Sequence, residues 1–411
     1  MKPMGPIPPW FEAEEGMLLI EGSGVAALVD EAGDTPLFVY DMNVVRAKIA
    51  LLRDAMPDGL HLHYAMKANP YAPLLAAIGP LVDGFDIASG GELEMALGSG
   101  MAAERISFAG PGKRDDELRA AIQAGVTINL ESEGEAARAL GIGEIVGVTP
   151  RLAVRVNPDF DLKGSGMKMG GGAKPFGVDA ERASALARSV IAAGAEWRGW
   201  HIFAGSQALD AAALMETQAA TVALAARLSD EVGATPPLVN IGGGFGVPYF
   251  PGDLPLDVKA IGLALEEVLT LPPDSLRGSA FALELGRYLV AEAGVYLTRV
   301  VDVKDSHGER FAIVDGGLHH QLAASGNFGT VVRRNYPVAI ANKFGLEGPE
   351  QAVTVEGCLC TPLDRLADKV ALPAVEPGDL IAIFLAGAYG ASASPAAFLG
   401  HRPALEMLVG D

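Results

Sequence analysis

The sequence predicts an α/β protein in which a (β/α)₈ barrel, over residues 35–290, is followed by an all-β domain. Two patterns predict this fold class. Between residues 35 and 290, short apolar runs alternate with amphipathic stretches, which is typical of parallel strands joined by helices. After Tyr288, β-branched runs are joined by loops instead of helices. A chain of 411 residues is long enough for two domains.

Eight apolar runs are the predicted barrel strands. They cover residues 61–68, 85–89, 106–110, 127–131, 151–157, 200–205, 238–244 and 281–286. Helical periodicity between them predicts helices over residues 91–98, 115–124, 133–140, 179–193, 211–232 and 256–271. Eight strands within roughly 250 residues are typical of a closed (β/α)₈ barrel. An open, doubly wound sheet is the alternative, but Gly-x-Gly-x-x-Gly does not follow the first strand.

The C-terminal part has a different sequence pattern. Strand-like runs cover residues 295–304, 311–315, 353–359 and 380–385, and loops join them. A further apolar run at residues 37–41, just before the barrel, fits either part of the chain.

The composition excludes several kinds of partner. The formal net charge is −20 at pH 7, so we expect neither a nucleic acid nor an anionic membrane as partner. The N-terminal segment lacks the apolar core of a signal peptide, and no apolar run reaches membrane length. The two cysteines, Cys358 and Cys360, are too close along one strand to form a disulfide bond readily. We therefore expect a reduced, cytoplasmic protein.

The segment HLHYAMKANP, at residues 61–70, places one lysine at the end of the first predicted barrel strand. On a strand, His61, His63, Ala65 and Lys67 share one face. A lysine on the inner face of a buried strand is costly, because burial disfavours the ammonium form. Such a lysine is usually kept for covalent chemistry, in which its free amine reacts with a carbonyl group. A strand-end lysine that reaches solvent is the alternative interpretation.

Two late barrel strands end in residues that suit an anionic ligand. Three successive glycines in NIGGGFG, at residues 240–246, let backbone amides approach a phosphate closely. Barrels of this kind often bind phosphate after strands seven and eight. The next strand ends in ELGRY, at residues 284–288. Glu284 and Arg287 form either a simple salt bridge or a pair of ligands, for a protonated ring nitrogen and an anion respectively.

Two loops are further candidates. The Gly/Lys-rich loop at residues 163–177 does not match the ATP-binding phosphate loop, so we interpret it as either a flap near an active site or a plain surface loop. The segment AGAYG, at residues 386–390, places Tyr389 between small residues, which lets a ligand lie close to the backbone.

Cysteines and histidines in the C-terminal part have no metal-binding pattern. Cys358 and Cys360 are predicted on one strand face, either as small buried apolar residues or as a thiol acid–base. Two cysteines are too few for a zinc site. His319, His320 and His401 lack the spacing of metal ligands, so we expect surface or loop histidines and no metal.

Together these motifs resemble the pyridoxal-phosphate-dependent decarboxylases of barrel type, the diaminopimelate/ornithine/arginine decarboxylase family. In the family's order, the chain contains YAMKAN at 64–69, FDIAS at 85–89, GSQ at 205–207, GGGFG at 242–246, ELGR at 284–287, GCLCTPLD at 357–364 and GAY at 387–389. The resemblance implies the alanine-racemase-like fold (fold type III), in which residues 1–34 and 291–411 form a β-domain that contributes to the active site. It also implies pyridoxal 5′-phosphate as cofactor and a homodimer with shared active sites.

The resemblance also implies roles for individual residues. Lys67 matches the lysine that binds the cofactor covalently, and Glu284 matches the carboxylate that pairs with the pyridinium nitrogen. Cys360 matches the thiol that, from the neighbouring subunit, returns a proton after carbon dioxide leaves. The other residues expected around the cofactor and its phosphate are Asp86, Arg155, His201, Phe203, Ser206, Gly243, Gly244, Gly286, Arg287 and Tyr389. Those expected at the substrate are Arg287, Thr361, Asp364 and Tyr389.

The chain departs from the family pattern at two positions. Phe203 stands where the family has a histidine stacked on the cofactor ring, and His201 is the candidate to replace that imidazole. Thr361 follows Cys360 where the family has an acidic residue that binds the distal amine of a diamino acid. This argues for a neutral-tailed or carrier-protein-linked amino acid as substrate, although Asp364 is nearby. Both departures are closer to decarboxylases of exopolysaccharide (exosortase-associated) and carrier-protein pathways.

The sequence therefore predicts a pyridoxal-phosphate-dependent carboxy-lyase that decarboxylates an amino acid or an amino-acid derivative. A racemase of related fold is one alternative, and it would need a second base facing Lys67. A non-catalytic regulator that kept the fold is another. Such a regulator is expected to lose Lys67 or the phosphate ligands, which this chain retains.

Overall fold

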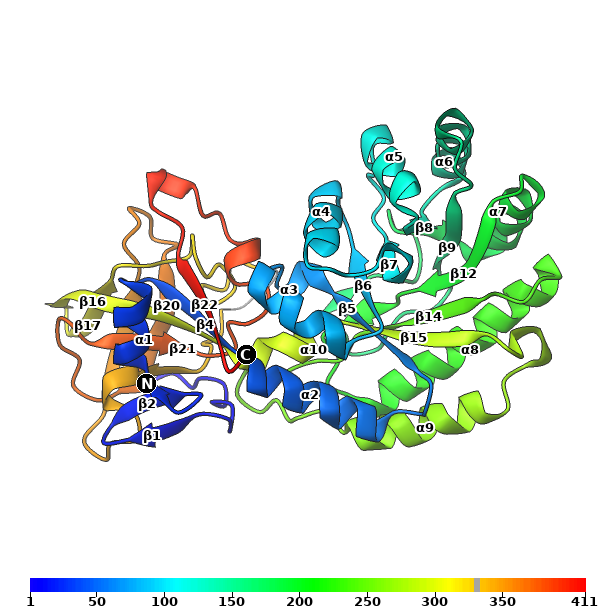
Figure 1. The fold of residues 1–411 in the computed structure, drawn as a ribbon. Coiled ribbons are helices and arrows are strands. Elements are labelled where there is room, and N and C mark those ends of the chain that lie inside the picture. Colours follow the sequence, from blue (N-terminus) through cyan, green and yellow to red (C-terminus); the bar gives the residue numbers. More distant parts are fainter. Residues whose placement is uncertain (329–332) are drawn as a thin grey trace. The chain divides into compact units, whose positions relative to one another are not determined.

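The computed structural model describes residues 1–328 and 333–411, apart from the side chain of residue 168. The chain divides into two compact units (Figure 1). The β unit consists of Met1–Lys48, Pro248–Leu254 and Arg287–Asp411, and the barrel unit consists of Ile49–Val247 and Pro255–Gly286.

Eight parallel strands of the barrel unit close into a ring. In their order around the ring they are β5 (His61–Ala65), β6 (Gly84–Ile87), β7 (Ile106–Phe108), β8 (Thr127–Leu130), β9 (Arg151–Asn157), β12 (Glu196–Ile202), β14 (Leu238–Gly243) and β15 (Ala280–Leu285). β15 pairs with β5 and closes the ring. The predicted (β/α)₈ barrel is confirmed, and the open doubly wound sheet is wrong.

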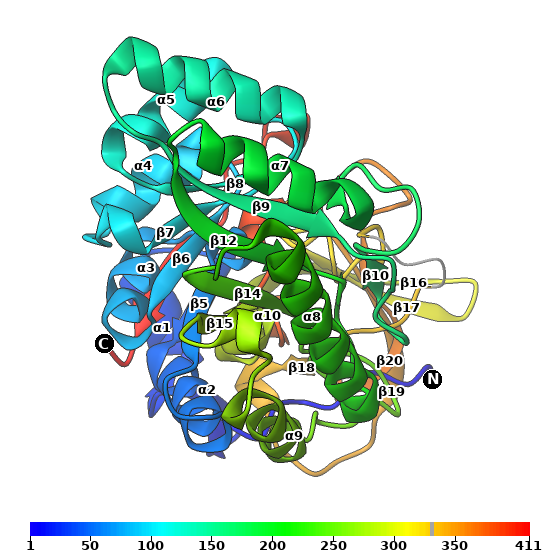
Figure 2. The same cartoon turned by 90° about the vertical axis from the view of Figure 1, so that its right-hand side faces the viewer.

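Helices connect these strands and lie around them (Figure 2). They are α3 (Ala72–Ile78), α4 (Gly90–Gly98), α5 (Asp115–Ala124), α6 (Glu133–Val146), α7 (Ala180–Ala192), α8 (Ala211–Val232) and α9 (Val258–Thr270). Ser132 caps the start of α6 by accepting a hydrogen bond from the backbone of Glu135, at 3.1 Å. α6 continues past the predicted end at residue 140, and Gly147 ends it in the left-handed conformation, at φ 70°.

One short strand pairs with a barrel strand, and two others form a separate two-stranded sheet. β11 (Val178–Asp179) pairs with β9, and β10 (Met167–Lys168) pairs with β13 (Gly205–Ser206). The second pair holds the predicted Gly/Lys-rich loop against the chain that follows β12.

The β unit contains a mixed sheet. Its strands are β18 (Val338–Ile340), β21 (Leu380–Ile383), β16 (Gly294–Ser306), β17 (Glu309–Val314), β19 (Gln351–Glu356) and β20 (Arg365–Leu372), in this order. β17 and β19 are parallel, whereas the other neighbours in this order are antiparallel. Strands account for most of the unit's regular structure, as predicted, but α1 (Val25–Ala32) and α10 (Arg287–Val290) show that it is not purely β.

The run at residues 37–41, which fits either part by sequence, belongs to the sheet of the β unit. It forms β4 (Leu37–Asp41), which pairs with β16 on one side and with β22 (Leu405–Val409) on the other. A small sheet of β1 (Glu12–Glu14), β2 (Met17–Ile20) and β3 (Ser23–Gly24) precedes it. Apolar side chains from both ends of the chain form one core, among them Leu18, Val39, Leu297 and Phe384.

The boundaries of the compact units differ from the predicted domain boundaries at residues 34/35 and 290/291. α2 (Met42–Ala55) runs from one unit into the other. Compactness does not test which segments fold as a domain, so the predicted domain division stays a prediction. Within the described ranges, no helix has both the length and the hydropathy that a membrane crossing requires.

Candidate active site

Lys67 lies just beyond the end of β5, on a short 3₁₀ turn formed by Met66–Ala68. It therefore does not share a strand face with the two histidines, and 45% of its side chain is exposed, which confirms the alternative interpretation of a strand-end lysine that reaches solvent. Asn69 shapes the turn: its backbone N–H donates to Met66 O at 3.1 Å, and its side-chain oxygen accepts from the N–H of Tyr71, also at 3.1 Å. The turn presents Lys67 at the carboxyl end of the barrel strands, where (β/α)₈ enzymes carry their active sites.

A buried carboxylate lies next to Lys67. Glu284, on β15, is only 7% exposed, and its Oε1 is 4.0 Å from Lys67 Nζ. Its Oε2 accepts a hydrogen bond from His201 Nε2 at 2.8 Å. Burial alone would raise the pKa of Glu284, but the hydrogen bond and charge of His201, together with Lys67, lower it. Glu284 is therefore a fixed negative charge.

Phe203 also lies beside Lys67, because the ring centroid is 5.8 Å from Nζ. His201 and Phe203 both belong to the end of β12 and the residues after it. The structure thus brings Lys67, His201, Phe203 and Glu284 together, as the sequence predicts. His201 contacts the carboxylate, and one of its ring nitrogens, Nδ1, has no hydrogen-bond partner among the described residues.

The glycine segment at the end of β14 is packed so tightly that side chains are excluded. A Cβ added to Gly243 would lie 2.0 Å from the carbonyl oxygen of Glu284. Gly244 has φ 82°, and a Cβ there would lie 2.7 Å from Gly205 O. The N–H of Ala208 donates to Gly244 O at 2.9 Å, which holds the Ser206 segment beside the glycines. Backbone amides and a hydroxyl therefore gather at the barrel end that suits a phosphate.

Asp86 and Arg155 have different surroundings. Asp86, on β6, is buried, and its Oδ2 is 3.4 Å from His63 Nδ1 without hydrogen-bond geometry. Burial would lower the pKa of His63, but the Asp86 carboxylate raises it. Arg155 donates to Glu131 Oε1 at 2.8 Å.

Sequence reasoning missed Glu131, which directly follows β8. Its carboxylate accepts from the backbone N–H groups of Gly110 and Gly177, both at 2.6 Å, in addition to Arg155. Burial would raise the pKa of Glu131, but Arg155 and Lys113 lower it. Its position directly after a barrel strand, where barrel enzymes carry functional residues, is the signal in the sequence that could have identified Glu131. Because Gly177 ends the Gly/Lys-rich loop, Glu131 also ties that loop to the barrel.

Arg287 and Tyr389 come together in the β unit. The guanidinium carbon of Arg287 lies 4.5 Å from the centroid of the Tyr389 ring and 5.4 Å from that of Tyr249. Its Nη1 donates to the Tyr249 hydroxyl at 3.1 Å, while its Nε is buried without a partner among the described residues. Tyr389 has φ 54°, a left-handed conformation that is rare outside glycine. Tyr249 was missed by the sequence analysis, because nothing in its local sequence marks it.

The predicted strand through both cysteines is wrong. β19 ends at Glu356, so Cys358 and Cys360 lie on an irregular loop. Cys360 is exposed and Cys358 half-buried, so the burial of both as small apolar residues is also wrong. Thr361 is half-buried. An exposed thiol at residue 360 is accessible to a reacting group outside its own loop.

Asp364 does not face a substrate in this structure. It is 1% exposed, and its two carboxylate oxygens accept from the backbone N–H groups of Leu318, at 2.6 Å, and Leu359, at 2.7 Å. Both carboxylate oxygens of Asp364 are therefore used by the backbone, and its role at a substrate amine stays a prediction. His319 and His320 lie in the loop after β17, which agrees with the prediction of surface or loop histidines, but both are buried, whereas His401 is exposed.

The residues around Lys67 fit pyridoxal phosphate. An accessible amine, a buried anion for the ring nitrogen and a glycine cradle at the phosphate end of the barrel all belong to the barrel unit. The orphaned Nδ1 of His201 and both oxygens of Asp86 are buried polar atoms without hydrogen bonds among the described residues. A polar ligand at this end of the barrel would offer them partners.

Comparison with known proteins identifies the family. Residues 42–291 match the family model of the pyridoxal-dependent decarboxylase, pyridoxal binding domain. The chain is 37% identical to the L-glutamyl–acyl-carrier-protein decarboxylase of Niallia circulans, over 91% of this chain and 89% of that protein. It is 33% identical to the diaminopimelate decarboxylase of Methanothermobacter thermautotrophicus, over 96% and 91% respectively.

Solved structures agree with the sequence comparison. The diaminopimelate decarboxylase of M. jannaschii, in complex with L-lysine, has a TM-score of 0.86 at 26% identity. The match covers 98% of this chain and 93% of that chain. The protein AQ1208 of Aquifex aeolicus has a TM-score of 0.84 at 31% identity, with coverage of 98% and 93%. The relatives favour neither the racemase nor the regulator alternative. The chain therefore belongs to the pyridoxal-dependent decarboxylase family and is a pyridoxal-phosphate-dependent carboxy-lyase of the alanine-racemase-like fold.

Proposed function

We propose that the substrate is an amino acid or amino-acid derivative whose side chain ends without a free ammonium group, because it is neutral-tailed or linked to a carrier protein. Thr361, a neutral residue, follows Cys360, and the nearby carboxylate of Asp364 is committed to two backbone amides. This observation carries the proposal, because an ammonium that leaves water needs a charged partner. The Niallia circulans relative, whose name specifies a glutamyl group on an acyl-carrier protein, supports it.

The barrel unit supplies the groups that hold the cofactor. Bound pyridoxal phosphate supplies an aldehyde for the substrate amino group and a ring that accepts the electron pair left by carbon dioxide. Lys67 would hold the aldehyde carbon, and Phe203 would be the aromatic side chain beside the ring. Glu284 pairs with the ring nitrogen and keeps it protonated, while His201 fixes the orientation of that carboxylate through its 2.8 Å hydrogen bond.

The remaining assignments concern the phosphate and the pocket wall. Backbone amides of Gly243 and Gly244 and the hydroxyl of Ser206 would bind the phosphate. Arg287 and Tyr389, which match the family's positions for the phosphate and the substrate carboxylate, are the further candidates. Asp86 and Arg155 line the cofactor. Gly286 lets the end of β15 pack closely against the end of β5, since a Cβ there would lie 2.8 Å from Ala65 O.

Cys360 is the proposed proton donor. Its thiol is exposed on a loop. It is therefore accessible to a substrate carbon that is bound elsewhere in the enzyme. After carbon dioxide leaves, the thiol returns a proton to that carbon and is reprotonated from solvent. We further propose that the active enzyme is a homodimer in which Cys360 of one protomer serves the Lys67 site of the other.

Substrate specificity tests this proposal. We expect kcat/KM for a carrier-linked or neutral-tailed amino acid to exceed that for lysine, ornithine or diaminopimelate by roughly 10- to 100-fold, because a missing charge-assisted hydrogen bond costs about 1.5–3 kcal/mol. Thr361→Glu should raise kcat/KM for the diamino acids, and Thr361→Gln, of equal size without the charge, should not. Efficient wild-type turnover of a free diamino acid, unchanged in Asp364→Asn, would contradict the proposal.

A further inference from the structure

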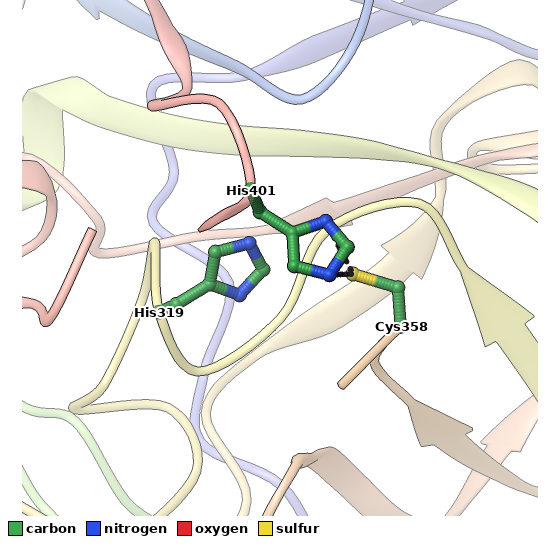
Figure 3. Close-up of side chains that lie close together, drawn as sticks. All are labelled: His319, Cys358 and His401. Atoms are coloured by element: carbon green, nitrogen blue, oxygen red, sulfur yellow. Dashed lines mark hydrogen bonds between the residues drawn. The ribbon is translucent and has the colours of Figure 1, made fainter. Parts of the chain in front are cut away.

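Three side chains that favour zinc-like metals come together in the β unit from separate parts of the sequence. His319 comes from the loop after β17, Cys358 from the loop after β19, and His401 from the segment before β22. One donor atom from each lies within 4.8 Å of the other two. Figure 3 shows the two imidazole rings and the thiol turned toward one another. We propose that Cys358, His319 and His401 bind a divalent transition metal of the zinc class.

His319 provides an independent observation. It is 0% exposed, and neither of its ring nitrogens has a hydrogen-bond partner among the described residues. A buried imidazole without a partner loses the hydrogen bonds that water would have given it, which costs free energy. Coordination to a metal restores an interaction for one of these nitrogens.

The neighbouring histidine shows the contrast. His320 uses both ring nitrogens: Nδ1 is 3.1 Å from the Tyr296 hydroxyl, and Nε2 is 2.8 Å from Arg402 O. Since Arg402 is the residue after His401, this second hydrogen bond holds two of the ligand-bearing segments together. Both ring nitrogens of His320 thus have hydrogen-bond partners. The ring of the adjacent His319 instead faces the thiol of Cys358 and the imidazole of His401.

Asp364 connects the segments that carry the other ligands. Its carboxylate accepts from the backbone of Leu318, directly before His319, and from that of Leu359, directly after Cys358. The N–H of Cys358 also donates to Gly316 O at 3.0 Å. The ligand set is therefore held by its supporting hydrogen bonds before any metal binds, which is the arrangement that gives useful metal affinity.

The Cys358–His401 distances are slightly longer than those of a tetrahedral site, and the three donor atoms lie within 4.8 Å of one another. Cys358 Sγ lies 3.9 Å from Nδ1 and 4.0 Å from Nε2 of His401. With bonds of about 2.3 Å to sulfur and 2.0–2.1 Å to nitrogen, tetrahedral zinc needs separations of about 3.3–3.6 Å between its ligand atoms. Among the three ligands, the exposed His401 side chain has the most room to move closer to the other two. One thiolate and two imidazoles suit zinc or cobalt, whereas magnesium and calcium prefer oxygen ligands.

The site replaces the expectation that no metal binds. Spacing rules detect ligands that are close in sequence, and these three come from separate loops. Cys358 is two residues from Cys360, so a bound metal would restrain the loop that carries the proposed proton donor. The thiol proton of Cys358 is released to solvent when the metal–sulfur bond forms. Metal binding itself does not depend on the proposed substrate or on turnover.

Metal binding by the holoenzyme tests the proposal. We expect metal-depleted holoenzyme to bind one Co²⁺ per chain, with the d–d absorption of a four-coordinate site at wavelengths longer than those the cofactor absorbs, and to bind Zn²⁺ in competition with a chromophoric chelator. Cys358→Ser and His401→Gln should lower the affinity for Zn²⁺ by at least tenfold. His319→Gln should do the same, and circular dichroism will show whether this buried change disturbs the fold.

Matched controls distinguish this site from unspecific binding. Cys360→Ser alters the other cysteine, and His307→Gln alters an exposed histidine, so both should bind Zn²⁺ with wild-type affinity. The proposal would be overturned if Cys358→Ser and His401→Gln, whose side chains are not fully buried, bound Co²⁺ and Zn²⁺ like the wild type. Absence of the Co²⁺ absorption in wild-type holoenzyme, or its loss in Cys360→Ser, would equally overturn the ligand assignment.

Discussion

The side chain of Lys67 is accessible to solvent, and its neighbours are held in place by the barrel. Its side chain is 45% exposed, while a carboxylate 4.0 Å away and the Phe203 ring constrain where its amine can lie. An exposed amine can be reached by the aldehyde of a cofactor that enters from solvent, which a fully buried lysine would prevent. Its position, rather than burial, therefore makes this lysine suitable for covalent attachment.

Borohydride treatment of the holoenzyme should fix the cofactor covalently to Lys67, and peptide mapping by mass spectrometry should find the label there. Lys67→Ala should lose the cofactor absorbance and nearly all activity. Lys163→Ala, which removes an exposed lysine paired with Glu216, is the matched control and should keep both. A label on another lysine would show that the anchor is wrongly assigned.

The charge of Glu284 is the second prediction at this scale. Glu284→Gln should lower kcat by roughly 10- to 100-fold at saturating cofactor, because a neutral amide no longer favours a protonated ring nitrogen, and an interaction with a charged group contributes about 1.5–3 kcal/mol. Glu284→Asp keeps the charge and should lose less. Steady-state kinetics, with cofactor occupancy measured alongside, checks this, and equal losses in the two variants would refute a role for the charge.

At the scale of elements, β14 and its glycines fix the distance between neighbouring strands. Gly243 pairs with Glu284 across the β14–β15 ladder, and the space for a side chain at Gly243 is filled by the backbone of β15. A substitution here would therefore move the strand that carries the ring-nitrogen partner as well as the phosphate cradle.

Gly243→Ala should weaken cofactor binding at least tenfold and lower the free energy of unfolding by about 1–3 kcal/mol, the usual cost of overpacking. Cofactor titration by fluorescence and denaturant unfolding measure the two effects. Gly98→Ala, at a helical position where the added methyl meets nothing within 4 Å, is the control and should be neutral or slightly stabilising. Wild-type cofactor affinity in Gly243→Ala would exclude a tightly packed cradle.

The sequence predicts the elements well where periodicity is strong and poorly where chain direction changes. α5 and α8 have the predicted bounds, because capping residues and left-handed glycines mark their ends. For the 3₁₀ turn at Lys67 and the loop at Cys358 the sequence predicts strand, because both segments follow apolar runs that give no sign of where strand pairing stops.

The candidate site shows the same division. Lys67, Phe203 and Glu284 are marked by motifs, and the structure brings them together. The hydrogen bond between His201 and Glu284 spans two strands separated by β14, so no local pattern reveals it. The role of Asp364 depends on two backbone amides, one of which lies 46 residues away in the chain, and this contact exists only in the folded protein.

At the scale of the whole molecule, the proposed homodimer predicts complementation between inactive variants. Lys67→Ala and Cys360→Ala chains should each be inactive, and their mixture should regain activity, because a hybrid dimer contains one site with both groups intact. Random exchange should restore at most about a quarter of the wild-type activity per protomer. Native mass spectrometry confirms the exchange, and hybrid dimers without activity would argue against shared sites.

The position of β4 also affects how the protein is made. All five of its residues are buried in the finished sheet, between β16 and β22, yet both partners lie on the far side of the barrel sequence. During translation, this apolar segment must remain unpaired until the whole barrel has left the ribosome. It is then a candidate for chaperone binding or misassembly. Slow synthesis within the barrel would prolong that exposure, whereas a change near residue 405 would leave β4 with an open edge in the completed chain.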